Sequence, residues 1–200
     1  KNLYLKSSDS SRRDETTSRL KVNWQLADNT KIKLLISQVD LDDPADIWTV
    51  DGSLNTLSDR PGMDSQKTNS YGIKIFHSFD GFEFQSFTSS TDTDVIFSYD
   101  ADWGNADSHF PYVYDYFSET FRDRKLFNQE FRAVSDSANF LKDSFLEWVI
   151  GANYLELKET NLKKDDGLYG DTSDPYGPYA SASSSSSRYK SSNFSVFGNL

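Results

Sequence analysis

The chain of 200 residues contains no cysteine, five prolines and one methionine, and it has no long hydrophobic run. Without cysteine, a disulfide framework and a thiolate metal site are excluded. Without about 18 consecutive apolar residues, a transmembrane helix is excluded as well. A transmembrane β-strand is apolar only at alternate positions, so this absence leaves open a membrane that is crossed by strands.

Positive charge is scarce as well. The chain has 21 Lys and Arg against 31 Asp and Glu, which gives a formal net charge of −10. Because binding to nucleic acid needs clustered Lys and Arg that contact the phosphates, we expect no nucleic-acid partner. The chain is rich instead in aromatic residues, which make up 15% of it although it is polar overall.

Signatures of catalysis and metal binding are missing too. There is no G-x-S-x-G stretch and no Gly-rich phosphate loop, and His77 and His109 are isolated in the sequence. The Asp clusters at 40–43, 92–94 and 100–102 lack the spacing of a calcium loop. We therefore expect no enzyme, no cofactor and no metal site, although Asp-rich loops also suit cationic or carbohydrate ligands.

Alternation of apolar and polar residues is the main structural signal, and it predicts β-strands. It runs through 19–26, 31–43, 71–79, 126–134, 146–157 and 189–200, with a partial strand at 1–5. Asp80-Gly81 between two aromatic-rich runs predicts a hairpin turn. From Phe82 to Tyr99 there is no Pro or Gly, so a strand there would reach roughly 60 Å, about three times the usual length.

The links between these segments alternate in length. Those near 28–30 and 80–81 are short and the one near 136–144 is moderate, whereas those near 6–13, 44–65, 100–117 and 161–188 are long and polar. Segment 181–187, SASSSSS, is of low complexity and is predicted to belong to a mobile loop. In an up-and-down antiparallel sheet, alternate links lie at opposite ends, so one end is predicted to have tight turns and the other extended loops.

The two faces of the predicted sheet differ in character. One face collects apolar side chains that we expect to face membrane lipid: Leu20, Val22, Trp24, Ile32, Leu34, Ile73, Ile75, Trp148 and Ile150. The other collects polar and charged side chains: Arg19, Lys21, Asn23, Lys31, Lys33, Lys74, Glu83, Gln85, Asn128, Glu130, Arg132, Glu147 and Asn153. So many charges are too costly for a protein core and suit the polar lumen of a barrel. An ordinary sheet with one wet face is the alternative.

The predicted long loops are rich in Tyr and Trp, which suit binding surfaces because they offer large, rigid contacts. We expect solute contacts from Trp48, Trp103, Tyr112, Tyr114, Tyr169 and Tyr176. The alternative is that these residues pack the loops together or lie in an aromatic girdle at the membrane interface.

Four stretches, in this order, resemble the barrel of TonB-dependent outer-membrane receptors: TLSDRPGMDSQKTNSYGIKI, FEFQSFTSSTDTDVIFSYDADW, FRDRKLFNQEFRAVS and FLEWVIGANYLELKE. The resemblance covers nearly the whole chain and is silent about substrate. It implies a barrel of about 22 strands that is plugged by an N-terminal domain, in the outer membrane of a Gram-negative bacterium. Such receptors take up a scarce solute, with a ferric siderophore as the default and cobalamin or an oligosaccharide as others. The TonB–ExbB–ExbD complex drives this uptake through the plug.

Residues 1–200 are therefore expected to be part of the barrel domain of such a receptor, without the plug domain, the TonB box and the remaining strands. The predicted fold is all-β, an antiparallel up-and-down meander of about eight long strands from a larger transmembrane β-barrel. Alone, it is predicted to be an open, curled sheet with unpaired edges. Two alternatives stay open: a soluble extracellular β-domain that binds glycans or acts as an adhesin, and a passive porin.

Overall fold

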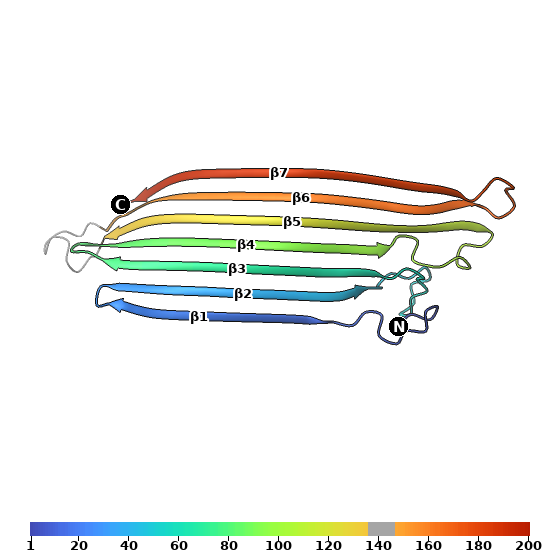
Figure 1. The fold of residues 1–200 in the computed structure, drawn as a ribbon, viewed down its shortest axis with the longest axis horizontal. Coiled ribbons are helices and arrows are strands. Elements are labelled where there is room, and N and C mark those ends of the chain that lie inside the picture. The colour runs from blue at the N-terminus through green and yellow to red at the C-terminus, as the bar shows by residue number, and fades with distance from the viewer. Residues whose placement is uncertain (136–146) are drawn as a thin grey trace.

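The structure, a computed structural model, describes residues 1–135 and 147–200, which form one antiparallel sheet of seven strands (Figure 1). The strands are β1 (Glu15–Ala27), β2 (Thr30–Ala45), β3 (Gly62–Ser78), β4 (Phe82–Asp100), β5 (Tyr112–Ser135), β6 (Val149–Asp171) and β7 (Tyr179–Asn199). Each strand pairs with the next one along the chain. The predicted all-β antiparallel meander is thereby confirmed. No helix in the described part is long and apolar enough to cross a membrane.

The partial strand expected at 1–5 is not formed, so the described part has seven strands instead of about eight. Asn2 makes only isolated bridges, to Ser7 and Thr56. Its backbone N–H donates to the Ser7 carbonyl at 2.9 Å, and the Leu3 N–H donates to the Thr56 carbonyl at 2.9 Å. The N-terminal segment therefore satisfies its backbone by binding the link that follows β2, and it adds no strand to the sheet.

The hairpin predicted at Asp80-Gly81 is confirmed. Residues 79–81 connect β3 to β4, and the Phe79 N–H donates to the Phe82 carbonyl at 2.8 Å. Gly81 has a φ of 87°, a conformation that side chains other than glycine rarely adopt. The strand that follows is as long as the sequence predicts, with 19 residues from Phe82 to Asp100.

Among the links that the structure describes in full, the two at one end of the sheet are tight, as expected, and those at the other end are longer (Figure 1). Residues 28–29 and 79–81 connect strands at the end that we call the turn end. Segments 1–14, 46–61, 101–111 and 172–178 lie at the opposite end, the loop end. The moderate link predicted near 136–144 lies outside the described residues.

The long loop predicted over 161–188 is wrong. Strand β6 continues to Asp171 and β7 begins at Tyr179, so the loop between them spans only 172–178. The low-complexity residues 181–187 lie in β7 and pair with 161–167 of β6. Amino-acid composition does not show which backbone groups will pair. A long neighbouring strand can form backbone hydrogen bonds with any residue that has an N–H group, and the small side chain of serine fits into a strand without a steric clash. Similarly, the loop predicted over 100–117 shrinks to 101–111 because β5 begins at Tyr112.

Strand register sorts the side chains onto two faces, because directly paired residues share a face and alternate along each strand. Face A carries Trp24, which is opposite Ile32, which in turn is opposite Ile75. All the residues predicted to face lipid lie on face A, including Trp148, whose ring lies 6.4 Å from that of Phe82. The polar residues predicted for the other side lie, within the strands, on face B.

The described part of the sheet has no hydrophobic core. Ala45 is its one buried hydrophobic residue, and its other buried residues are polar residues and glycines. The edge strand β1 is exposed along its whole length, and β7 along nearly all of its length. The sheet is open, with unpaired edges at β1 and β7, as predicted. Within residues 1–135 and 147–200 no second sheet covers either face.

Two glycines of β3 provide a test of how closely the backbones of β3 and β4 approach each other. An alanine Cβ at Gly62 would lie 1.9 Å from the Ser98 carbonyl oxygen, whereas at Gly72 the closest atom, Cβ of Leu35, is 3.6 Å away. Because backbone atoms cannot move aside cheaply, we expect Gly62→Ala to destabilise the protein by about 2 kcal/mol or more. Gly72→Ala is the matched control, and we expect it to stabilise by about 0.5 kcal/mol. Thermal or urea unfolding measures both; equal effects would contradict the close approach at Gly62.

Candidate functional site

Face A carries a group of half-buried to exposed hydrophobic side chains near the turn end, which we call the apolar band; β4 interrupts it with Ser86, Thr88 and Ser90. Its members lie on β1 to β3 and β5 to β7: Leu20, Val22, Trp24, Ile32, Leu34, Ile36, Tyr71, Ile73, Ile75, Phe127, Phe131, Ile150, Tyr154, Phe194 and Val196. Trp24 is 53% exposed and Phe194 70% exposed. A water-soluble protein rarely leaves so large a patch uncovered, so the band calls for a partner surface.

The apolar band has a defined height. On β3 it runs from Tyr71 to beyond Ile75 and ends at Phe79, which spans roughly 27 Å along the strand. A strand tilt of about 40° reduces this to about 20 Å, close to the apolar band of roughly 25 Å on a membrane barrel. Aromatic residues mark the turn-end border, where the Phe79 and Phe82 rings stack 4.8 Å apart. Tyr71 and Phe127 lie in the row of paired residues at the loop-end border.

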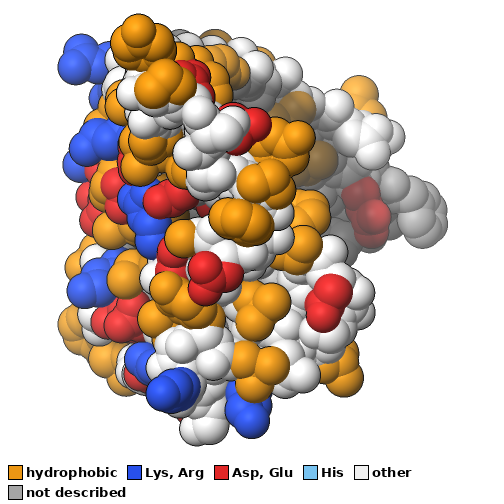
Figure 2. Space-filling model, turned by 90° about the vertical axis from the view of Figure 1, so that its right-hand side faces the viewer, with side chains coloured by type: hydrophobic (Ala, Val, Ile, Leu, Met, Phe, Trp, Pro, Cys, Tyr) orange, Lys and Arg blue, Asp and Glu red, His pale blue; other side chains and the backbone are white. Residues whose placement is uncertain are grey.

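Face A changes character immediately beyond the band. The next row toward the loop end holds Ser18, Gln38, Asn69, Asp92, Lys125, Lys158 and Lys190. Its cations are matched by carboxylates: Lys125 lies 3.6 Å from Asp92, and Lys190 lies 3.1 Å from Glu156. Viewed along the strands from the loop end, Lys and Arg side chains gather on one side with Asp and Glu between them (Figure 2). This part of face A is suited to water.

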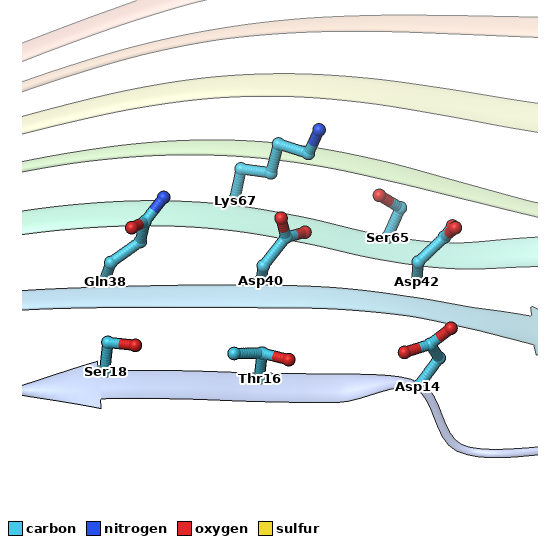
Figure 3. Close-up of a pocket in the computed structure, with 8 residues that line it drawn as sticks. All are labelled: Asp14, Thr16, Ser18, Gln38, Asp40, Asp42, Ser65 and Lys67. Carbon is cyan, nitrogen blue, oxygen red and sulfur yellow. The ribbon is translucent and has the colours of Figure 1, made fainter.

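A shallow hollow lies in this hydrophilic part of face A (Figure 3). Its side chains come from the segment that leads into β1 and from β1, β2 and β3: Asp14, Thr16, Ser18, Gln38, Asp40, Asp42, Ser65 and Lys67. Asp40 is directly opposite Lys67 in the ladder, a favourable pairing of charges. The hollow contains no aromatic or apolar side chain and is open to solvent, so it has the character of a hydrated strand surface.

At the loop end, buried polar side chains tie three segments together. The Asn2 amide donates to Asp46 at 3.0 Å and to the Ser58 carbonyl at 2.8 Å, and the Thr56 hydroxyl donates to Asp46 at 2.7 Å. The Asn105 amide donates to the Leu57 carbonyl at 2.7 Å. The N-terminal segment, the 46–61 loop and the 101–111 loop are therefore held in one arrangement. Sequence reasoning missed this network, since isolated Asn and Thr residues in polar loops carry no pattern.

Loop 101–111 is folded around two buried carboxylates. Asp102 accepts hydrogen bonds from the backbone N–H of Gly104 at 2.9 Å and of Tyr116 at 2.7 Å. Asp100 accepts from the backbone N–H of Asp102 and of Trp103, both at 3.2 Å, while its other oxygen has no partner among the described residues. Burial raises the pKa of Asp100 to about 6, and the charge of Asp102 adds to the rise while its hydrogen bonds oppose it.

Tyrosine rings form a second feature of the loop end, on face B, which we call the tyrosine ledge. Tyr114 is directly opposite Tyr169, which is directly opposite Tyr179. The Tyr114 and Tyr116 rings lie 4.8 Å apart, and the Tyr169 and Tyr179 rings 5.7 Å apart. Gly167 lies beneath the Tyr116 ring, where an added Cβ would meet Cδ1 of the ring at 2.6 Å. The ledge is half exposed and rigid, as a binding surface requires.

The predicted solute-contacting residues are thus only partly brought together. Tyr112, Tyr114 and Tyr169 share face B at the loop end, but they lie in strands instead of loops. Trp48 packs against Tyr99, with ring centroids 5.1 Å apart. Trp103 and Tyr176 lie in loops 101–111 and 172–178, and Tyr176 is 86% exposed.

Arg60 is a further loop-end residue that the sequence pattern did not single out. Its guanidinium lies 2.9 Å from Asp166 and 3.4 Å from Asp115, and 4.5 Å from the Phe117 ring centroid. These contacts fasten the 46–61 loop to β5 and β6. Among the described residues, no group of three or more His, Cys, Asp or Glu is placed to hold a metal ion. His109 lies 3.8 Å from Asp102, and His77 shares a hydrogen bond of 2.8 Å with Thr30.

Comparison with protein-family profiles, curated proteins and solved structures finds no match to this chain. The resemblance to TonB-dependent receptors therefore stays a prediction from the four sequence stretches. The apolar band, the tyrosine ledge and the tied loops are the structural features from which function is inferred.

The raised pKa of Asp100 predicts that the 101–111 loop loses stability as pH rises. The folded-state pKa of about 6 exceeds the ordinary value of 3.8, so the folded protein binds more protons between these values. The stabilisation by protonated Asp100 is present below about pH 4 and lost as pH rises through 6. The quantity to compare is the hydrogen-exchange rate of the Asp102 and Trp103 amides in wild type divided by the rate of the same amides in Asp100→Asn. We expect this ratio to rise from pH 4 to pH 7.

Hydrogen exchange followed by mass spectrometry measures this ratio at each pH, which removes the intrinsic pH dependence of exchange. Asp107→Asn, at an exposed position in the same loop, is the matched control and should leave the ratio to wild type constant. A ratio between wild type and Asp100→Asn that does not change with pH would contradict the role of Asp100.

Proposed function

We propose that this chain is part of the wall and outer loops of a β-barrel in the outer membrane of a Gram-negative bacterium. The barrel belongs to an energy-coupled receptor of the TonB-dependent kind, which takes up a scarce solute. The observation that carries the proposal is the apolar band: one face of a single sheet carries hydrophobic side chains on six of its seven strands over about the height of a membrane, and the next row toward the loop end is polar or charged.

Membrane lipid fits the apolar band better than a second protein layer. In a soluble sandwich, a second sheet would cover the band and leave its residues buried. Within the described residues the band has no such cover, and Trp24 is 53% exposed. The loop-end border of the band also lies within two neighbouring rows of paired residues across the strands that carry it. The flat boundary between membrane hydrocarbon and water explains such a border, whereas the edge of a protein interface need not follow the rows.

The length of the strands fits this placement. Spanning a membrane takes about 9–11 residues per strand, whereas β5 has 24 and β6 has 23. The surplus lies on the loop-end side of the band, where face A is mainly polar but includes Ile96, Phe121 and Leu162, and face B carries the tyrosine ledge. With the tight links on the periplasmic side, the strands rise above the outer leaflet and present the tied loops and the tyrosine ledge to the medium.

The tyrosine ledge is the proposed place of solute contact. A ferric siderophore is the default that the resemblance implies. The loops 46–61, 101–111 and 172–178 carry Asp46, Asp51, Asp59, Asp102, Asp107 and Asp174 against a single arginine, Arg60. Rings next to carboxylates favour a neutral or cationic solute at this end, such as the sugars of an oligosaccharide.

Leu34 and Leu35 test the membrane placement, because these neighbours in β2 are 37% and 36% exposed but lie on opposite faces. Leu34→Arg puts a charge into lipid and should cost about 2–4 kcal/mol. Leu35→Arg, on the polar face, is the matched control; it lies directly opposite Lys21, so its cost should be confined to the repulsion between two cations, about 1 kcal/mol or less. Urea unfolding of the full-length protein from liposomes measures both. Equal costs, or a wild-type protein that is extracted in water without detergent, would contradict a membrane barrel.

Energy-coupled uptake is tested separately from the barrel. We expect the amount of the protein to rise at least several-fold when cells are limited for the solute that it carries, with iron, cobalamin and glycan limitation as the three arms. Uptake of that solute should stop in a strain without TonB, while a passive porin would transport equally well there. The complete gene should also encode a plug domain upstream of this segment; its absence would favour the porin or a soluble domain.

A further inference from the structure

Four lysines lie close together on face B at the turn end, and we call them the basic patch: Lys21, Lys31, Lys33 and Lys74. Lys33 is directly opposite Lys74 in the ladder between β2 and β3. Such pairs have Cβ atoms about 5 Å apart, and like charges in this position are destabilising. Lys31 and Lys21 lie one row of face B to either side of this pair. In a chain with a net charge of −10, this local excess of positive charge is unexpected.

In β5 to β7, most cations lie within 4.0 Å of a carboxylate, whereas Lys164 and Arg188 have no such ion pair among the described residues. Arg124 lies 2.6 Å from Glu159, Lys163 lies 3.0 Å from Asp165, and Lys190 lies 3.1 Å from Glu156. Within 1–135 and 147–200, none of the four patch lysines has a carboxylate within 4.0 Å.

The acidic side chains that face the basic patch do not neutralise it. Glu130 is engaged by Arg132 on its own strand. Glu83 and Asp28 line a hollow together with Lys31 and Lys33, but neither forms an ion pair with them. The patch therefore carries an excess of positive charge, and no ion pair with a described residue offsets the repulsion among its lysines.

A hollow in face B lies within this patch. We call its apolar lining the floor, which includes Leu35, Phe76 and Phe87 beside Gly72, and its polar lining the rim, which includes Lys21, Lys33, Lys74, Glu130 and Arg132. The Lys33 ammonium lies 5.0 Å from the Phe76 ring centroid, and the Lys74 ammonium 4.9 Å from that of Phe87. Cation–π attraction holds both ammonium groups over the floor, where they can donate hydrogen bonds to an occupant.

We propose that the basic patch binds an anionic ligand that carries carboxylate or phosphate groups. Three lysine ammoniums supply charge-assisted hydrogen bonds, Asn23 and Asn128 on the rim supply neutral ones, and the apolar floor contacts the body of the ligand. The ligand removes the like-charge repulsion of Lys33 and Lys74. This site lies at the opposite end of face B from the tyrosine ledge, and it requires only the charges of face B, not contact of face A with lipid.

Binding of citrate and of inorganic pyrophosphate to the full-length purified protein tests the site. In isothermal titration at low ionic strength, we expect both anions to bind and Lys33→Gln with Lys74→Gln to weaken binding at least tenfold. The matched control, Lys67→Gln with Lys190→Gln, removes two charges from face A and should change binding less than threefold. Lys33→Arg with Lys74→Arg keeps the charges and should retain binding.

Two results would overturn the proposal. One is that wild type binds neither anion at low ionic strength; the other is that the face A control weakens binding as much as the face B variant does. Thermal unfolding guards against a variant that fails to fold: without anion, the face B variant should unfold at the same temperature as wild type or higher, because a repulsion is removed. Citrate should then raise the unfolding temperature of wild type and leave that of the face B variant unchanged.

Discussion

The organisation of this protein depends on an apolar sheet face that residues 1–135 and 147–200 leave uncovered. Backbone hydrogen bonds between neighbouring strands hold the sheet together, but they do not remove apolar side chains from water. In a sandwich, the second sheet does this. Here the strands are much longer than the apolar band that they carry, so only part of each strand needs a cover. In the membrane placement that we propose, a lipid bilayer covers this band and leaves the rest of each strand in water.

Face B is divided along the strands into regions of different chemistry. The turn end holds lysines that repel each other over a floor of aromatic rings, and the loop end holds neighbouring tyrosine rings, tilted against each other, next to loops rich in Asp. If face B lines a lumen, the field along it changes sign between the two ends. Low-dielectric walls strengthen such a field, so solutes of opposite charge meet opposite preferences at the two ends.

Much of this arrangement could be predicted from period-2 alternation, because a strand with one apolar face leaves that pattern in the sequence. Trp24, Leu34 and Ile73 share a face as predicted, and the Asp80-Gly81 turn required a glycine at positive φ. The serine-rich part of β7 could not be predicted, since both of its faces are wet and alternation disappears. The Asn2–Asp46 contact was also invisible, because it joins residues 44 positions apart through loops that have no period.

Strand parity limits how the sheet can continue. In an antiparallel meander each strand reverses direction, so β1 and β7, the first and last of seven, run the same way (Figure 1). The two edges therefore cannot pair with each other as antiparallel neighbours, and closure of these seven strands alone is excluded for a barrel with an even number of antiparallel strands. An odd number of further strands must lie between β7 and β1 to close such a barrel. The exposed N–H and C=O groups along both edges are where those strands would pair.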